Sequence, residues 1–329
     1  MKRCRNCAMC AAILFIAGAQ HPSTVVSSGA VPLQGTAGSG FARGQTLRYR
    51  VYTDWVTQGE RGGLVEDPQA PRQVETTFRA LIRFEVLEVT QAEVRFRAHF
   101  ESATAILRSD SFDPLAATLE ENYRKLDGQG FEFVLENGGK VKQLIGLPQV
   151  LTHERTAGAL RDWLDLLFSR SNLPAGAAPG QKWTSEEVQP ASPLAGVVWR
   201  ARSTYVRKGP CREPAPPTGG MVTPDPPAEE CAVIETRTEI LRPPGAAADP
   251  TPEDYRVRGL RTSGKWSGTG ETLSYISLRT GLLVSRTQTM KESLEFTVTG
   301  GDGQRQLKYS SRAATETHIT FIPENVQPE

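Results

Sequence analysis

A single helical pattern stands between two stretches of β-type patterning, and this arrangement limits what the chain can fold into. In residues 151–173 the apolar side chains recur at i, i+3, i+4, i+7 and i+8, so they share one stripe along a helix. The stripe consists of Leu160, Trp163, Leu164, Leu167 and Phe168. One amphipathic helix cannot bury its stripe alone, so the sequence predicts that this helix packs on a sheet.

Apolar and polar residues alternate on both sides of that helix, which is the period of a half-buried strand. The clearest strands cover 78–89 and 93–101, and the connection at Thr90 and Gln91 is short enough to predict a hairpin. Charged residues alternate with the apolar ones, which is typical of an antiparallel sheet with one face in water. Further strands are expected at 47–52, 131–135, 141–145, 196–207, 232–241, 273–278, 282–288, 294–298, 307–311 and 318–322.

These elements predict a mainly β protein, built as a curved antiparallel sheet or open barrel and covered by one amphipathic helix. We expect a single β-rich domain at 45–323, with halves at 45–150 and 183–323 that are joined by the helix at 151–173. The hairpins at 131–145 and 273–288 share a layout of strand, glycine turn and returning strand. An internal duplication explains this likeness, and so does the general similarity of hairpins.

The amino-terminal residues have the parts of an export signal. Lys2, Arg3 and Arg5 precede a short apolar run, and Ala-Gly-Ala at 17–19 fits the pattern of a cleavage site. The sequence therefore predicts a signal peptide at 1–19 and a periplasmic or secreted protein. The apolar run of about a dozen residues is too short to span a bilayer, and no later run is longer, so we expect no membrane span after cleavage.

Small and polar residues at 20–44 predict a disordered leader, and residues 324–329 are expected to form a tail. Loss of the signal peptide changes the charge from 38 basic against 37 acidic residues to 35 against 37, a formal −2. A protein so close to neutral has no long-range field that attracts polyanions, so no nucleic-acid partner is expected.

Cysteines indicate one disulfide. Cys4, Cys7 and Cys10 lie inside the export signal and are expected to be removed with it. Cys211 and Cys231 remain, on either side of a proline-rich loop, and two thiols in an exported chain are expected to pair.

No motif in the sequence names a chemical activity. His153 and Glu154 begin the zinc-binding pattern H-E-x-x-H, but Ala157 stands where the second histidine belongs. The glycine-rich residues 264–270 precede a strand and not a helix, so they predict a tight turn or bulge in place of a phosphate cradle. We therefore expect no enzyme, no metal site and no cofactor.

The export signal, the one-sided strands, the T-G-L-L hairpin at 280–283 and the single covering helix resemble uncharacterised secreted bacterial β-sheet proteins. The sheet with one helix is also similar to the half-barrel of periplasmic lipoprotein-localisation factors. This similarity covers residues 45–323 as architecture only, and the disulfide loop departs from it. It provides no motif from which binding residues can be carried over.

Two functional hypotheses follow, and neither specifies the oligomeric state. The first is a binding protein that holds an apolar or acyl-chain molecule between sheet and helix. Its expected lining residues are Phe84, Phe96, Phe100, Phe131, Phe133, Trp163 and Leu167. The second is an interaction or structural module of the cell envelope that presents the proline-rich disulfide loop to a partner protein. Against the first stands the simpler interpretation that these aromatic residues only fill the core.

Overall fold

The computed structural model describes most of the chain between residues 41 and 323. The described ranges are 41–63, 73–110, 120–136, 139–146, 160–161, 163–165, 167–168, 173–174, 176–188, 192–211, 229–243, 249–301 and 306–323. The predicted signal peptide, most of the predicted leader, the tail, the proline-rich segment 212–228 and both ends of the predicted helix lie outside the described residues.

Strands make up most of the described structure, as the alternating pattern predicts. They are β1 (Thr46–Gly63), β2 (Gln73–Val89), β3 (Glu93–Ser109), β4 (Gly130–Glu136), β5 (Val141–Ile145), β6 (Lys182–Val188), β7 (Val198–Pro210), β8 (Glu230–Leu241), β9 (Arg261–Ser277), β10 (Leu283–Thr299) and β11 (Gln306–Ile322). A short helix, α3 (Glu253–Arg256), precedes β9.

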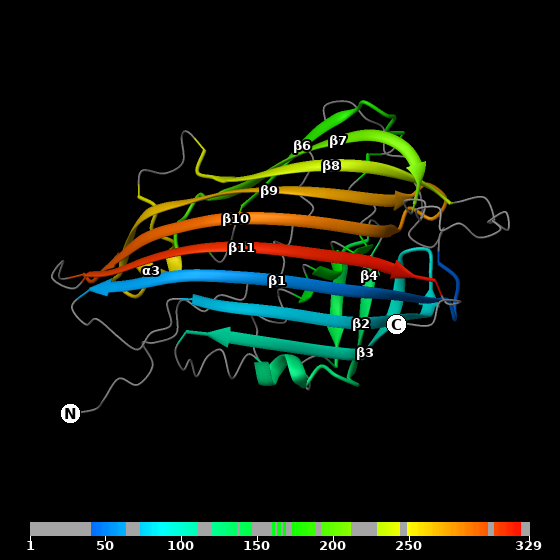
Figure 1. Cartoon of the computed structure of the whole chain (residues 1–329), viewed down its shortest axis with the longest axis horizontal. Helices are drawn as coiled ribbons and strands as arrows, with labels where there is room; N and C mark the ends of the chain where they lie inside the picture. Colours follow the sequence, from blue (N-terminus) through cyan, green and yellow to red (C-terminus); the bar gives the residue numbers. More distant parts are fainter. Residues whose placement is uncertain are drawn as a thin grey trace, which may run out of the picture.

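The strands form one antiparallel sheet in the order β5-β4-β3-β2-β1-β11-β10-β9-β8-β7-β6 (Figure 1). Two meanders, β1–β5 and β6–β11, extend outward from the centre, where the first strand pairs with the last. Among the described strands β5 and β6 are the two edges, and they do not pair with each other. The prediction of a mainly β, antiparallel, open sheet is confirmed.

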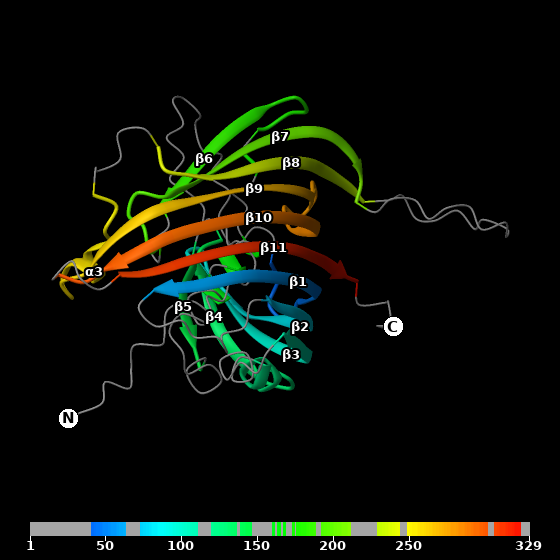
Figure 2. The ribbon, with the colours of Figure 1, turned by 60° about the vertical axis from the view of Figure 1, so that its left-hand side comes forward.

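The sheet is strongly curved, and β4 and β5 cross behind its long strands (Figure 2). Alternate residues of each strand lie on the buried side, which we call the inner face; the other side is the outer face. On β1 the inner face carries Leu47, Tyr49, Val51 and Thr53, each at most 6% exposed. The apolar cluster of the inner face includes Tyr49, Phe84, Phe96, Phe133, Ile234, Ile276, Leu283 and Ile319.

Several strands are longer than the alternating pattern predicts. Residues 282–288 and 294–298 belong to one strand, β10, and residues 307–311 and 318–322 belong to one strand, β11. Polar residues on the inner face interrupt the apolar alternation in both, which is why the pattern divided them. Strand β6 was not predicted, because only one large apolar residue, Trp183, is followed by polar ones.

The prediction of a turn or bulge at residues 264–270 is wrong. These residues lie in β9, and its pairing with β10 keeps a regular register through them. A Cβ atom at Gly268 would lie 2.8 Å from the carbonyl oxygen of Lys291, and one at Gly270 would lie 2.8 Å from Sδ of Met290. The glycines therefore allow two strands to approach closely, and they do not reverse the chain.

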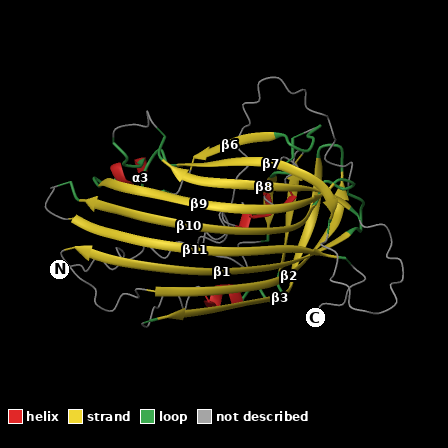
Figure 3. Ribbon diagram, turned by 45° about the horizontal axis from the view of Figure 1, so that its top comes forward, coloured by secondary structure: helices red, strands yellow, loops and turns green. Residues whose placement is uncertain are grey.

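Helical residues are few (Figure 3). Residues 120–124 form a short helix before Gly128. Within the predicted helix, Trp163, Leu164, Leu167 and Phe168 are helical and at most 5% exposed, and they pack into the apolar cluster. The predicted stripe therefore points into the core.

The fold begins slightly before the predicted domain boundary. Phe41, which the sequence analysis places in the leader, packs its ring 5.1 Å from that of Phe96. The amide of Gly44 donates a hydrogen bond to the carbonyl of Val86 (2.8 Å). The last residues of the predicted leader thus lie against the sheet.

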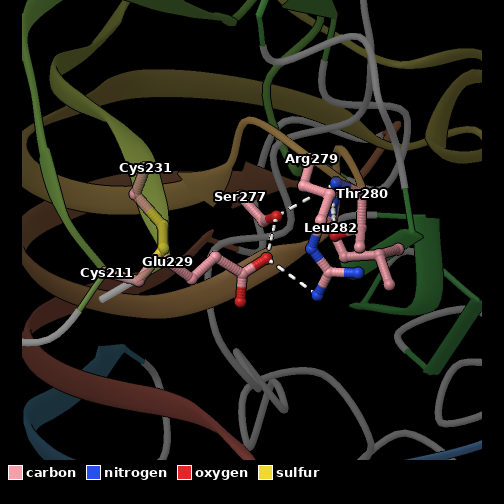
Figure 4. Close-up of a disulfide and its surroundings, with 7 residues drawn as sticks. All are labelled: Cys211, Glu229, Cys231, Ser277, Arg279, Thr280 and Leu282. Carbon is pink, nitrogen blue, oxygen red and sulfur yellow. Dashed lines mark hydrogen bonds and ion pairs between the residues drawn. A yellow bond between two sulfur atoms is a disulfide. The ribbon is translucent and has the colours of Figure 1, made fainter. Parts of the chain in front are cut away.

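The predicted disulfide between Cys211 and Cys231 is present and ties the two ends of the proline-rich segment together (Figure 4). Glu229 beside it accepts a hydrogen bond from the hydroxyl of Ser277 (2.5 Å) and forms an ion pair with Arg279 (3.3 Å). The disulfide is therefore joined through Glu229 to the turn between β9 and β10.

Replacement of both Cys211 and Cys231 by Ser should lower the free energy of unfolding by about 3 kcal/mol, because the disulfide closes a loop of 20 residues and restricts the unfolded chain. Urea titration of the variant and of the oxidised wild type measures this difference. The reduced wild-type protein is the control and should match the variant; equal stability of the oxidised wild type and the variant would contradict the prediction.

Candidate functional site

The structure brings the seven predicted lining residues together on the inner face. Phe84 lies on β2, Phe96 and Phe100 on β3, Phe131 and Phe133 on β4, and Trp163 and Leu167 on the helical segment 160–168. The rings of Phe96 and Phe133 stack with centroids 5.1 Å apart, and the Phe84 and Trp163 rings are 6.3 Å apart. All seven side chains belong to the apolar cluster.

These residues are packed closely against one another, at no more than 5% exposure. Phe168, which was not among the predicted lining residues, contacts the rings of Phe84, Phe96 and Phe133 at centroid distances of 5.0–5.5 Å. Such packing is that of a protein core. The role of the seven residues as ligand lining therefore stays a prediction, beside the interpretation that they fill the core.

A row of buried polar residues crosses the inner face next to this cluster, and the sequence analysis missed it. Each member stands directly opposite the next one on the neighbouring strand, and each is at most 8% exposed. In strand order the polar row is Thr53, Thr317, Gln288, Thr272, Thr236 and Ser203. Two internal hydrogen bonds are present, Thr53 to Thr317 (3.3 Å) and Ser203 to Thr236 (2.8 Å).

Arg286 lies on the inner face two residues before Gln288, and it is only 4% exposed. Its Nε donates a hydrogen bond to the hydroxyl of Ser274 on β9 (3.0 Å). Within the described part of the chain this is its only hydrogen bond, and it forms no ion pair there. Burial lowers the pKa of Arg286 to about 10, so the guanidinium still carries its charge at neutral pH.

Among the described residues, four buried polar atoms on the inner face have no hydrogen-bond partner. They are Nε1 of Trp55 and of Trp199, the hydroxyl oxygen of Tyr205 and Oγ1 of Thr272. Buried polar atoms are normally paired, and an unpaired one costs about 1–3 kcal/mol. Thr272 stands opposite Gln288, and Ser274 stands opposite Arg286, so polar atoms concentrate around these two neighbouring pairs on β9 and β10.

A carboxyl group occupies the same face further along β10. Glu292 accepts a hydrogen bond from Nε1 of Trp266 (3.2 Å) and stands opposite Gly268. Burial raises the pKa of Glu292 to about 7, and the hydrogen bond from Trp266 opposes this rise only in part. Glu292 is six residues from Arg286, which is about 20 Å along a strand, so the two do not pair.

Another buried carboxylate lies near β5. Asp165 falls on the polar side of the helical pattern, yet it is 7% exposed and accepts a hydrogen bond from the amide of Val141 (2.5 Å). This bond joins the helical segment to the start of β5. The position of Asp165 in the sequence, on the polar side of the helical pattern, does not predict this hydrogen bond.

A hollow of about 550 Å³ lies over β1, β11, β10 and β9. Most of its lining residues alternate onto the outer face, among them Val56, Lys291 and Arg312. It shares no residue with the predicted lining set, and it is not the space between sheet and helix. It also shares no residue with the buried polar row.

The described residues contain neither a membrane-spanning helix nor a metal-binding cluster. No helix there is both long and apolar enough to cross a membrane. No group of three or more His, Cys, Asp or Glu residues is arranged there to hold a metal ion.

No protein-family model matches this sequence, and no curated protein matches it. Lipovitellin, solved for its lipid–protein interactions, is similar over 88% of this chain and 26% of its own, with 13% identity and a TM-score of 0.37. The chain thus spans about a quarter of the lipovitellin chain.

Two further solved structures are similar. The outer membrane protein OprG from Pseudomonas aeruginosa has a TM-score of 0.19 and 5% identity, over 86% of this chain and 98% of its own. A DUF1329 family protein from Desulfovibrio piger has a TM-score of 0.16 and 10% identity, over 84% of this chain and 87% of its own. Likenesses at these scores carry no conclusion about fold or function, so the resemblance to lipoprotein-localisation half-barrels stays a prediction.

Glu292→Gln should remove a pH dependence of stability. The Glu292 carboxyl holds its proton more tightly in the folded protein than in the unfolded chain, where its pKa is 4.5. Its stabilising contribution is therefore complete below pH 4.5 and is lost as the pH rises through about 7, a change of about 3 kcal/mol. Urea titrations from pH 4 to 8 should show the wild type losing this stability relative to Glu292→Gln.

The matched control is Glu295→Gln, which changes an exposed carboxyl group on the outer face of the same strand. It should leave the pH dependence of the wild type in place. Parallel pH curves for the wild type and Glu292→Gln would contradict the prediction.

Proposed function

We propose that this protein is an exported, non-enzymatic binding protein that holds an apolar or acyl-chain molecule on the inner face of its sheet. The helical segment 160–168 then covers the ligand from the other side. The observation that carries the proposal is the composition of the inner face, where a wide apolar cluster borders a buried polar row. In that row Oγ1 of Thr272 has no hydrogen-bond partner among the described residues. A core that serves only stability has no need of that polar row, because buried polar groups stabilise less than apolar ones.

The border between the two parts suits a long and narrow ligand. Ile319 and Val51 continue the cross-strand row of Arg286 toward β1, and both are at most 4% exposed. From there the apolar cluster extends over β2 and β3 to Phe133 on β4. Between β10 and β4 lie five strand spacings of about 4.8 Å, or about 24 Å before curvature, which a single long acyl chain can follow.

Other observations support the remaining parts of the proposal. The disulfide between Cys211 and Cys231 suits an exported protein, because oxidising compartments form and keep such bonds. Within the described residues, Glu292 accepts a hydrogen bond from the Trp266 indole and Asp165 accepts one from the Val141 amide, and both contacts join parts of the fold.

A side chain that fills the inner face should block the ligand. Thr236→Phe places a ring in the polar row, whereas Arg237→Phe places the same ring on the outer face, where the arginine side chain is 80% exposed. If the inner face holds a ligand, Thr236→Phe should weaken binding of a fluorescent fatty acid at least tenfold. It should lower the melting temperature of the ligand-free protein no more than Thr236→Ala, which loses the same hydrogen bond to Ser203. Arg237→Phe should bind like the wild type.

The same pair of variants distinguishes a ligand site from a filled core. In a filled core the extra ring overpacks the interior, so Thr236→Phe should lower stability by about 1–3 kcal/mol. That loss, together with no binding of the fatty acid by the wild type, would overturn the proposal. A fatty acid that carries a photoreactive diazirine on its chain gives a second test, because it should label peptides of β11, β1–β4 and the helical segment.

A further inference from the structure

We propose that Arg286 binds the anionic head group of the ligand, so that the protein selects single-chain amphiphiles with a negative charge over uncharged ones. This inference rests on the proposed function and deepens it. It concerns one side chain that the packing of the sheet does not need and that no other described residue neutralises.

The position of Arg286 is unusual for a cation. Its side chain is 4% exposed and lies between Ile319 on β11 and Ser274 on β9, directly opposite both. A buried charge is normally paired with an opposite charge, because an isolated one loses its hydration without compensation. Among the described residues the Arg286 side chain has one neutral partner, the Ser274 hydroxyl. A guanidinium has five N–H donors, so most of its donor capacity is unused there.

The neighbours of Arg286 complete a receptor for an anion. Gln288 follows it on the same face of β10, and Thr272 stands opposite Gln288 on β9. In the part of the chain that the structure describes, the Thr272 hydroxyl has no partner, and Gln288 and Thr272 are only 5% and 6% exposed. A guanidinium, an amide and a hydroxyl therefore lie on two adjacent cross-strand pairs, whose side chains are about 5–8 Å apart. Arginine binds carboxylate and phosphate through two parallel N–H donors, and these neighbours can supply further hydrogen bonds.

The receptor is placed at the end of the apolar cluster. Leu283 and Ile276 belong to that cluster and lie on the same two strands as Arg286 and Ser274. The hydroxyl of Tyr49 donates a hydrogen bond to the carbonyl of Leu283 (2.9 Å), so this border is itself held in place. An amphiphile with its charged head at Arg286 would lay its chain over the apolar cluster, and this order of polar and apolar groups matches that of a fatty acid.

The first measurement compares two ligands of equal chain length in the wild-type protein after lipid removal. Palmitate carries a carboxylate, and hexadecanol carries a hydroxyl group in its place. Isothermal titration should show palmitate binding about tenfold to a hundredfold more tightly, which is the usual contribution of hydrogen bonds to a charged group. A third ligand, lysophosphatidate with the same chain, tells carboxylate from phosphate: whichever anion binds more tightly identifies the head group.

The second measurement changes the cation. Arg286→Met should bring the affinity for palmitate down to that for hexadecanol and leave hexadecanol binding unchanged. Without ligand, Arg286→Met should melt at the same temperature as the wild type or higher, because it removes an unpaired buried charge. Arg237→Met, which changes an exposed arginine on the outer face of β8, is the matched control and should keep the preference for palmitate.

Arg286→Lys keeps the positive charge but lacks the two parallel N–H donors of the guanidinium, so it should retain part of the preference for palmitate. This variant replaces Arg286→Met in the comparison if Arg286→Met does not fold. Equal affinity of the wild type for palmitate and hexadecanol would overturn the role of Arg286 and leave the proposed function intact. Binding of neither ligand would overturn both. A preference for palmitate that survives in Arg286→Met would place the anion elsewhere on the inner face and refute this inference alone.

Discussion

The pairing of the first strand with the last is the contact on which the rest of this structure depends. Strand β1 runs antiparallel to β11 from Arg48 opposite Ile322 to Gly63 opposite Leu307, and this ladder alone joins the two meanders into one sheet. Through it, Ile319 of β11 and Leu283 of β10 reach the apolar cluster that Phe84 and Phe96 begin. This contact joins strands that are far apart in the sequence, so nearly the whole chain between them forms a closed loop. The chain therefore loses conformational entropy before the hydrogen bonds and side-chain contacts of the β1–β11 ladder can stabilise the sheet.

Much of the fold could be predicted from the sequence, because period-two alternation marks a strand wherever one face is apolar. The alternation identifies the hairpin of β2 and β3, the hairpin of β4 and β5, and the separate strands β7 and β8. The alternation gives no information on which strands far apart in the sequence become neighbours, so it could not predict that β1 pairs with β11. The glycines of β9 misled it for a different reason, since a glycine required by a close neighbouring strand looks like a glycine required by a turn.

The candidate site was predictable only in its apolar part. Phe96 and Phe133 stand out in the sequence because they are large and alternate regularly, and Trp163 stands out because it lies on the helical stripe. The inner face of the same sheet also carries Thr272, Gln288 and Arg286, but their polar or charged side chains are of the kind expected on an outer face. Carrying the alternation of β8 past Ile234 would have placed Thr236 and Thr238 inside. A search that tests for apolar residues cannot find an inner face that changes from apolar to polar along its strands.

The inner face thus has an apolar part, which stabilises the fold, and a polar part, which can bind a ligand. The aromatic rings over β2, β3 and β4 remove large apolar areas from water, so they account for the cohesion of this part of the sheet. The polar row over β7–β11 and β1 lowers the gain from burial, since its groups give up water for at most one hydrogen bond within each pair, Thr53 with Thr317 and Ser203 with Thr236. The Thr272 hydroxyl gains no partner among the described residues. A valine or leucine at each of these positions would serve a core better. Groups that reduce stability at a buried position are commonly those that take part in function, and Arg286 is the most costly of them.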